Sequence, residues 1–306
     1  MKTALVTGRD GFVARHLIKK LSGYSVLGTE DLGDFIRQHP QSFDLVVHLA
    51  ANIENVDARM RGGVGMYQDT VLDYAMAEYL EKHPPRECAV WMTSCAVDYP
   101  DDPYAWVKLN GEKLAAALHR RGVPIAILRP YSGYGGNQAQ GYPFPAILGR
   151  AMRREDPLTV WGSGKQVRDW VHIDDLTDAI MWAIKDAPKG IPVPIGTGVG
   201  TDFLTLARMM AKAAGYEPEI KPLPQKAESS PRRVCDTTLA RMHGWKATIS
   251  LEEGIRRAVG EHESLQVLQG RGAEVSRCEV LPGSSGERPH PRSSASGTPA
   301  ADVWRD

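Results

Sequence analysis

Continuous apolar runs alternate with amphipathic stretches along the first 130 residues of the chain. The apolar runs have the pattern of strands buried on both faces of a sheet, and the stretches between them place apolar residues at helical spacing. The runs cover residues 3–8 (TALVTG), 44–51 (DLVVHLAA), 88–94 (CAVWMTS) and 124–130 (PIAILRP), and the helical stretches cover 12–21, 66–83 and 104–121. Strands alternating with helices predict an α/β fold with a doubly wound parallel sheet, in which ligands bind beyond the carboxyl ends of the strands.

The composition changes near residue 262. Beyond that point the chain is rich in Gly, Ser, Pro and Arg, as in GSSGERPHPRSSASGTPAAD at 283–302, and it shows no apolar period. Such a segment cannot bury enough apolar surface to offset the entropy lost on ordering. We therefore expect folded material up to about residue 260 and a disordered tail over 263–306.

The charge balance and the N-terminus limit the classes of partner. The chain has 37 basic and 37 acidic residues, so no overall field attracts nucleic acid or an anionic membrane. The apolar run at the N-terminus is too short for a signal peptide, and no later run is long enough to span a membrane. The four cysteines show neither metal-type spacing nor the density of a disulfide scaffold. We expect a cytoplasmic protein with no nucleic-acid partner, no membrane partner and no metal.

A glycine-containing turn follows the first predicted strand. Gly8 and Gly11 keep the spacing of the last two-thirds of a dinucleotide fingerprint, with Ala14 where a third glycine often stands. Gly8 allows a tight turn, and Gly11 lets a pyrophosphate approach the backbone amides at the helix N-terminus. The alternative is an ordinary strand-to-helix turn. The position directly after a strand and before a helix favours a dinucleotide site.

The second strand does not reveal which dinucleotide binds. An acidic residue that holds the ribose hydroxyls is expected at the end of this strand, about 20 residues after the turn. The strand YSVLGTED (24–31) has Gly28 and Thr29 there, Glu30 and Asp31 come slightly late, and no arginine is present that could bind a phosphate. NAD and NADP both remain open from the residues.

Tyr104 and Lys108 in PYAWVK are four residues apart within a predicted helix. Residues at this spacing lie on one helix face, about 5–6 Å apart at Cβ. A nearby ammonium favours a phenolate, so Tyr104 could exchange a proton near neutral pH. The alternative is a pair of ordinary helix-surface residues.

Taken together, the motifs TGRDGF, VVHLAA, MTSCAV, PYAWVK, LRPYSGYGG and VWGSGKQVRDWVHIDDL resemble the extended short-chain dehydrogenase/reductases, specifically the NAD-dependent epimerase/dehydratase family of nucleotide-sugar enzymes. The resemblance covers about residues 3 to 260. It implies a Rossmann-like domain formed mainly by 1–165, and a smaller C-terminal α/β substrate-binding subdomain formed mainly by 166–262, with the two interleaved.

The resemblance implies roles for individual residues. Tyr104 would be the catalytic acid/base, Lys108 would lower its pKa and hold the nicotinamide ribose, and Ser94 would hydrogen-bond the substrate oxygen. Counting back from Tyr99 places Cys95 in that last role instead; we prefer Ser94 because a hydroxyl is the better donor. The cofactor, NAD or alternatively NADP, would contact Gly8, Gly11, Phe12, Val13, Leu49, Ala50 and Ala51 together with Tyr104 and Lys108. The substrate would contact Ser94, Cys95, Ser132, Arg168 and Arg232.

Departures from the family pattern reduce the number of reactions that the resemblance favours. Cys95 and Ala96 stand where dehydratases have an Asp-Glu pair, which disfavours elimination of water. Cys95 resembles the cysteine of fucose-synthase-like enzymes, but no His occurs between His119 and His172, where their second residue is expected. The resemblance therefore favours a nucleotide-sugar 4-epimerase. The alternatives are an NADPH-dependent 4-keto sugar reductase or a non-catalytic dinucleotide-binding protein; a homodimer is the expected assembly.

Overall fold

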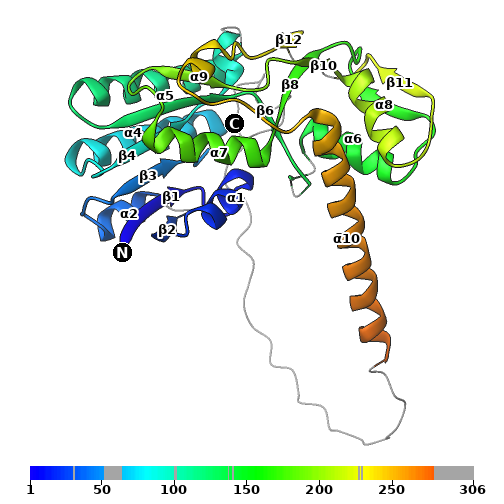
Figure 1. Ribbon diagram of the computed structural model, residues 1–306, viewed down its shortest axis with the longest axis horizontal. Helices are drawn as coiled ribbons and strands as arrows, with labels where there is room; N and C mark the ends of the chain where they lie inside the picture. The colour runs from blue at the N-terminus through cyan, green and yellow to red at the C-terminus, as the bar shows by residue number, and fades with distance from the viewer. Residues whose placement is uncertain are drawn as a thin grey trace, which may run out of the picture. The chain divides into compact units, whose positions relative to one another are not determined.

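A six-stranded parallel sheet forms the centre of the N-terminal part of the protein (Figure 1). The computed structural model describes residues 1–29, 32–51, 64–99, 102–136, 138–139, 141–226, 228 and 230–278, with side chains up to Ser264. In sheet order the strands are β2 (Tyr24–Thr29), β1 (Lys2–Thr7), β3 (Leu45–His48), β4 (Cys88–Met92), β5 (Ile125–Pro130) and β9 (Pro192–Ile195). The chain leaves β1 toward β2 on one side and continues at β3 on the other, so the strand order reverses between β1 and β3.

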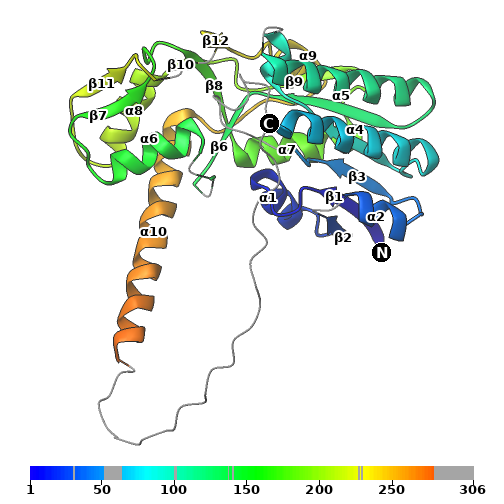
Figure 2. The ribbon, with the colours of Figure 1, turned by 180° about the vertical axis from the view of Figure 1, so that it is seen from behind.

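Helices cover both faces of this sheet (Figures 1 and 2). Alternate strand residues enter two apolar cores, with Val6 and Val47 facing one and Leu5 and Val46 facing the other. The first core is closed by α1 (Phe12–Lys20), α7 (Ile173–Lys185) and α9 (Thr238–Met242), and the second by α2 (Leu32–Gln38), α4 (Val64–Lys82) and α5 (Pro103–Arg120). This arrangement confirms the predicted doubly wound α/β fold.

A smaller set of elements forms a third core. Strand β8 (Val167–His172) pairs with β6 (Ser132–Tyr134), β10 (Gly200–Asp202) and β12 (Arg232–Arg233), and β7 (Leu158–Trp161) pairs with β11 (Ile220–Leu223). Helices α6 (Pro143–Met152), α8 (Phe203–Ala213) and the start of α10 (Leu251–Cys278) pack against these strands. Elements β6, α6 and β7, which precede residue 165, thus contribute to the third core. Helix α7 and strand β9, which follow it, belong to the main sheet and its first core.

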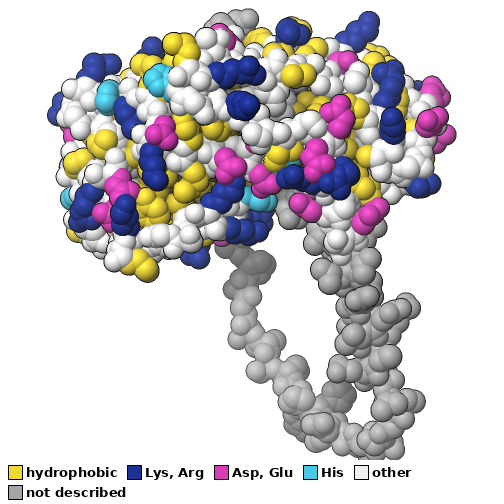
Figure 3. All heavy atoms as spheres, in the orientation of Figure 1, with side chains coloured by type: hydrophobic (Ala, Val, Ile, Leu, Met, Phe, Trp, Pro, Cys, Tyr) yellow, Lys and Arg dark blue, Asp and Glu magenta, His cyan; other side chains and the backbone are white. Residues whose placement is uncertain are grey.

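The contacts divide the chain at Glu263, with Ser264–Asp306 as a separate unit. Helix α10 continues to Cys278, through the start of the region expected to be disordered. The rest of the expected tail, 279–306, lies outside the described residues. None of the helices in the described part of the chain has both the length and the apolar character of a membrane span. Basic and acidic side chains are interspersed over the face drawn in Figure 3.

Candidate active site

The glycine turn lies where the strand order reverses, at the carboxyl ends of β1 and β3. Gly8 has a φ of +65°, and a Cβ on it would lie 3.0 Å from the Cα of Ala50 and 3.2 Å from the carbonyl carbon of Leu49. A Cβ on Gly11 would lie 2.9 Å from the carbonyl oxygen of Gly8. Both positions therefore require glycine, because a side chain would strain the backbone or collide with it.

The same turn leaves a cradle for an anion. Helix α1 starts at Phe12 with Gly11 as its N-cap, and no side chain caps it. The first N–H groups of a helix have no partner within the helix, and they favour negative charge. The residues present therefore fit the pyrophosphate of a dinucleotide, with Phe12 and Val13 in the first turn and Leu49, Ala50 and Ala51 on the adjacent strand end.

A buried hydrogen-bond chain supports the turn from below. The Thr7 hydroxyl oxygen accepts from the amides of Leu49 and Ala50, both at 3.0 Å, and lies 2.9 Å from Nδ1 of His48. With both lone pairs used, the hydroxyl donates its proton to Nδ1, so Nε2–H of His48 donates to Asp73 at 3.1 Å. His48 thus has a structural role, because it links the turn to α4 through Asp73.

Tyr104 and Lys108 lie at the N-terminus of α5, at the carboxyl edge of the sheet. Pro103 is the first residue of the helix, and the carboxylate of Asp102 caps it by accepting the amide of Tyr104 at 3.0 Å. Tyr104 is 8% exposed and Lys108 is 5% exposed, and the ammonium lies 5.2 Å from the centre of the phenol ring. The two side chains are therefore buried together, which ordinary helix-surface residues would not be.

Helix α4 supplies the charge that balances Lys108. The ammonium donates to the carboxylate of Asp69 at 2.9 Å, and the side chain of Asp69 is 1% exposed. Burial lowers the pKa of Lys108, but Tyr104, Asp69 and Asp73 outweigh this effect and raise it above its usual value. The sequence analysis did not identify Asp69 or Asp73 as site residues. The signal that could have found them is their spacing of four residues within the helical stretch 66–83, whose apolar residues predict that one face of the helix is buried.

The structure separates the roles open to Ser94 and Cys95. Ser94 is half-buried and caps the 3-10 helix η1 (Cys95–Asp98) by accepting the amide of Ala96 at 3.2 Å, which leaves its proton for another acceptor. Cys95 is 5% exposed and packs with Tyr131 and Cys235, and burial raises the pKa of its thiol. These surroundings support Ser94 as the donor to substrate.

Two arginines lie side by side on neighbouring strands. Arg168 on β8 is 5% exposed, and burial together with Arg233 lowers its pKa to about 10. The strand register opposes Arg168 to Arg233 on β12 and leaves Arg232 exposed. Arg232 and its neighbour Arg233 both resemble a substrate phosphate contact in the sequence. The structure places Arg233 beside Arg168, because successive side chains on a strand point to opposite faces.

Arg233 joins this pair to the end of α5. Its guanidinium lies 5.0 Å from the ring centre of Tyr99 and 3.6 Å from the carboxylate of Asp102, the N-cap that precedes Tyr104.

Ser132, another predicted substrate contact, is half-buried on β6, opposite Trp170 of β8 in the strand register.

Asp169 and Asp175, which follow Arg168 in its motif, accept hydrogen bonds from backbone amides. Asp169 accepts the amides of Thr197 and Gly198, and Asp175 accepts the amides of Thr248 and Ile249 at 3.0 and 2.9 Å. Asp169 and Asp175 thus bind backbone amides of the fold. The arginine is the member of the motif that is suited to an anionic ligand.

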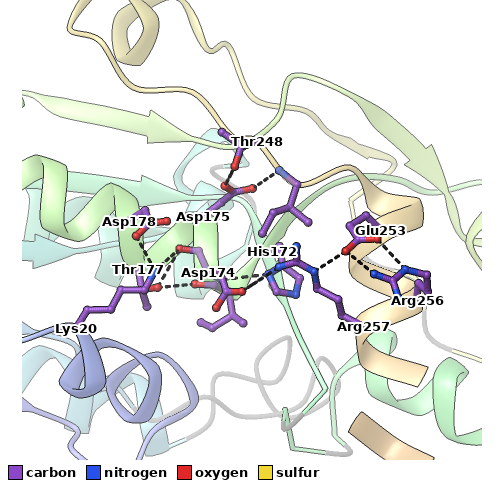
Figure 4. A network of polar contacts seen from close by, with 12 residues as sticks. Lys20, His172, Asp174, Asp175, Thr177, Asp178, Thr248, Glu253, Arg256 and Arg257 are labelled. Carbon is purple, nitrogen blue, oxygen red and sulfur yellow. Dashed lines mark hydrogen bonds and ion pairs between the residues drawn. The ribbon is translucent and has the colours of Figure 1, made fainter. Parts of the chain in front are cut away.

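The start of α7 ties three segments together (Figure 4). Lys20 of α1 donates to the carbonyl of Asp174, and Arg257 of α10 pairs with the Asp174 carboxylate at 3.3 Å. His172 caps the helix by accepting the amide of Asp174, and burial lowers the pKa of its imidazole.

The described residues contain no group of three or more His, Cys, Asp or Glu side chains that could hold a metal ion.

The fold and this site define a dinucleotide-binding α/β protein of the short-chain dehydrogenase type. The glycine turn lies at the switch point of the sheet, and the buried Tyr-Lys pair lies at the same edge. The chain belongs to the NAD dependent epimerase/dehydratase family, whose model matches residues 4–196.

Individual relatives agree with this assignment. The chain is 30% identical over 173 residues to a GDP-L-fucose synthase of Escherichia coli (strain K12), covering 51% of this chain and 54% of that protein. It thus spans about half the length of this relative and of several other curated relatives that it matches. It is also 24% identical over 296 residues to a dTDP-4-dehydro-6-deoxy-D-allose reductase of Streptomyces bikiniensis, covering 78% of this chain and 89% of that protein.

A solved structure shares the fold. A UDP-glucose 4-epimerase of Thermotoga maritima, determined with UDP-glucose, superposes with a TM-score of 0.78 at 23% identity. The match covers 86% of this chain and 99% of that one. At this identity the likeness establishes the architecture, and the reaction has to be argued from the residues.

Proposed function

We propose that the protein binds NAD or NADP and a nucleotide-diphosphate sugar, and that it catalyses hydride transfer at carbon 4 of the sugar. The observation that carries this proposal is the burial of Tyr104 beside Lys108 at the sheet edge that also holds the glycine turn. A bound nicotinamide supplies the hydride acceptor and donor. Tyr104 then takes the proton from the sugar hydroxyl, or returns it to the ketone oxygen.

The neighbouring residues have matching tasks. Lys108 keeps its ammonium beside the phenol. An ammonium has three donors, so the bond to Asp69 leaves capacity for a ribose hydroxyl. Ser94 would donate to the sugar oxygen on which Tyr104 acts. Arg168 and Arg233 form a buried cationic pair whose mutual repulsion a diphosphate would relieve, with the fork geometry that suits phosphate.

Two reactions share this centre, and the sequence ranks 4-epimerisation first. In that reaction the hydride returns to the opposite face of the same sugar and the cofactor is unchanged. The second candidate is reduction of a 4-keto sugar at the expense of NADPH. It is favoured by the two curated relatives named above, one a fucose synthase and the other a 4-dehydro sugar reductase.

An exposed apolar surface supports a homodimer. Helices α4 and α5 pack side by side through the second core, and large apolar side chains project from both into solvent. Their exposed fractions are 68% for Tyr67, 67% for Val71, 53% for Tyr74, 60% for Trp106 and 39% for Leu109. A second copy of the same two helices would cover this surface.

Substitution of Tyr104 tests the proposal. UDP-, GDP- and dTDP-sugars and their 4-keto forms would be screened first, with and without NADPH. Tyr104→Phe should then lower turnover by roughly 10²–10⁴, the usual value of a positioned acid/base, while nucleotide-sugar affinity barely changes. Tyr216→Phe removes a phenol oxygen that donates to the Glu155 carbonyl, far along the chain in the third core, and serves as the control.

Two further variants assign the donor to substrate. Ser94→Ala should lower turnover more than Cys95→Ala, because the Cys95 thiol is packed against Tyr131. If Tyr104→Phe converts an accepted sugar at the parental rate, the acid/base assignment is wrong.

A further inference from the structure

Ser94 is part of the short helix η1 and moves with it. Its hydroxyl accepts the amide of Ala96, and its carbonyl accepts the amide of Val97 at 3.3 Å. The amide of Tyr99 donates to the carbonyl of Ala96 at 2.9 Å, which closes the other end of the same turn. A displacement of Asp98, the last residue of η1, would therefore also displace the Ser94 hydroxyl.

Asp98 is held by two side chains from the end of β5. One carboxylate oxygen accepts Nη1 of Arg129 at 3.0 Å, and the other accepts the hydroxyl of Tyr131 at 2.8 Å. Tyr131 is 8% exposed and also packs against Cys95, the first residue of η1. The short helix is thus fastened at both of its ends to the segment that closes β5.

Arg129 is fixed in turn by Glu112 of α5. Its Nε and Nη2 donate to the two oxygens of the Glu112 carboxylate, each at 2.9 Å, so the pair is bidentate. Glu112 is 2% exposed and follows Tyr104 and Lys108 at successive intervals of four residues, so it lies on the same side of the helix. It also accepts the hydroxyl of Thr93, which directly precedes the N-cap of η1, at 2.9 Å. A single carboxylate on α5 therefore reaches both the end of β4 and the arginine that holds η1.

Asp98, Arg129 and Glu112 together form the η1 clamp. Apolar side chains of similar size can often replace a buried ion pair without loss of stability, because the desolvation of two charges offsets much of their attraction. Charge-assisted bonds in a bidentate pair, by contrast, fix one orientation. The clamp joins the segment that carries Ser94 to the helix that carries Tyr104, so its bonds set the relative positions of these two side chains.

We propose that the η1 clamp positions Ser94, so that its hydroxyl and the phenol of Tyr104 reach the same sugar oxygen. The inference rests on the proposed function and adds residues that act through Ser94. An error of about 1 Å in the placement of a reacting group can lower a rate roughly 100-fold. Loosening η1 should therefore lower turnover and leave the affinity for the nucleotide sugar, which we assign to the two neighbouring arginines, nearly unchanged.

Steady-state kinetics on the full chain test the clamp, with a UDP-, GDP- or dTDP-sugar that the parent converts in the screen above. Asp98→Ala should lower kcat by roughly 10–100-fold and change KM by less than about threefold. Asp98→Asn keeps an oxygen that accepts from Arg129 and an amide that can donate to the Tyr131 oxygen, so it should restore most of kcat. Glu155→Ala is the matched control and should keep the parental kcat. The Glu155 carboxylate also binds an arginine, and its side chain is 36% exposed against 38% for Asp98.

A double-mutant cycle separates positioning from a general loss of structure. In a Ser94→Ala background, Asp98→Ala should have little further effect on kcat, because no hydroxyl is left to position. Its effect on the free energy of unfolding in urea should be the same in both backgrounds. Tyr131→Phe removes one bond to Asp98 and should lower kcat by roughly threefold to tenfold, with the same dependence on Ser94. This variant decides the matter if Asp98→Ala does not fold.

The outcomes distinguish this inference from the function on which it rests. Parental kcat in Asp98→Ala or in Ser94→Ala, or losses that multiply in the double variant, would overturn the clamp and leave Tyr104 as the acid/base. A folded parent that converts no sugar of the panel would overturn both proposals.

Discussion

Replacing Asp69 by Ala should remove a large part of the stability of the protein. The pair with Lys108 is shielded from solvent, with side-chain exposures of 6% for Lys108 and 1% for Asp69. At 2.9 Å and an effective dielectric constant of about 20, the attraction between two unit charges is roughly 6 kcal/mol, part of which offsets their desolvation. Leaving one partner buried and unbalanced typically costs about 3–5 kcal/mol. Because Asp73 also attracts Lys108, we expect about 3 kcal/mol.

Urea unfolding followed by tryptophan fluorescence measures this loss. The free energy of unfolding would be compared for the parent, Asp69→Ala, Lys108→Met and the double variant. Removing both charges should cost less than the sum of the single changes, since neither charge is then left alone. Glu78→Ala is the matched control, because it breaks the exposed pair between Glu78 and Lys82 on the same helix and should leave the free energy near the parental value.

The pH dependence of this stabilisation follows from the raised pKa of Lys108. A group whose pKa is higher in the folded than in the unfolded protein stabilises the fold fully below its unfolded pKa, about 10.4 for lysine. The penalty for Asp69→Ala should therefore be constant from pH 7 to about 9 and shrink as the pH rises above about 10. An Asp69→Ala variant as stable as the Glu78→Ala control would refute the view that the pair balances a buried charge.

Two other predictions concern the ligands. Gly11→Val should abolish cofactor binding, whereas Gly23→Val, where a Cβ meets nothing within 4 Å, should bind as the parent does, and melting curves would check that both variants are folded. Equal titration of both folded variants with NADPH would place the site elsewhere. Arg168→Gln should weaken nucleotide-sugar binding by at least tenfold, and Arg232→Gln, at an exposed position, should change it little in the same calorimetric titration. The opposite order would show that Arg232 binds the phosphate.

The sheet was predictable from the sequence because its strands are buried on both faces. The four apolar runs correspond to β1, β3, β4 and β5, and the Gly8 turn lies at the predicted place. Strand β9 was missed because its sequence, PVPI, is four residues long and half proline, which gives no strand signal without its neighbour β5. Such an edge strand is stabilised by tertiary pairing rather than by its own pattern.

The chemistry of the site was predictable to the extent that it lies within short motifs. Tyr104 and Lys108 belong to one helix, so their contact follows from spacing. Asp69 contacts Lys108 from a different helix, so this contact has no local sequence signature. Which of Arg232 and Arg233 lies beside Arg168 depends on the register of a two-residue strand, and only the fold determines that register.

The direct passage of β8 into α7 makes the cofactor-binding half inseparable from the rest. Trp170 of β8 belongs to the third core, and Ile173, three residues later, belongs to the core under the main sheet. Asp175 also fastens the segment that leads into α10. A fragment ending at residue 165 would lack α7 and β9 and would expose one apolar face of its sheet to water. We therefore expect the two halves to unfold in a single cooperative transition, and we expect such a fragment to aggregate rather than to behave as an autonomous nucleotide-binding module.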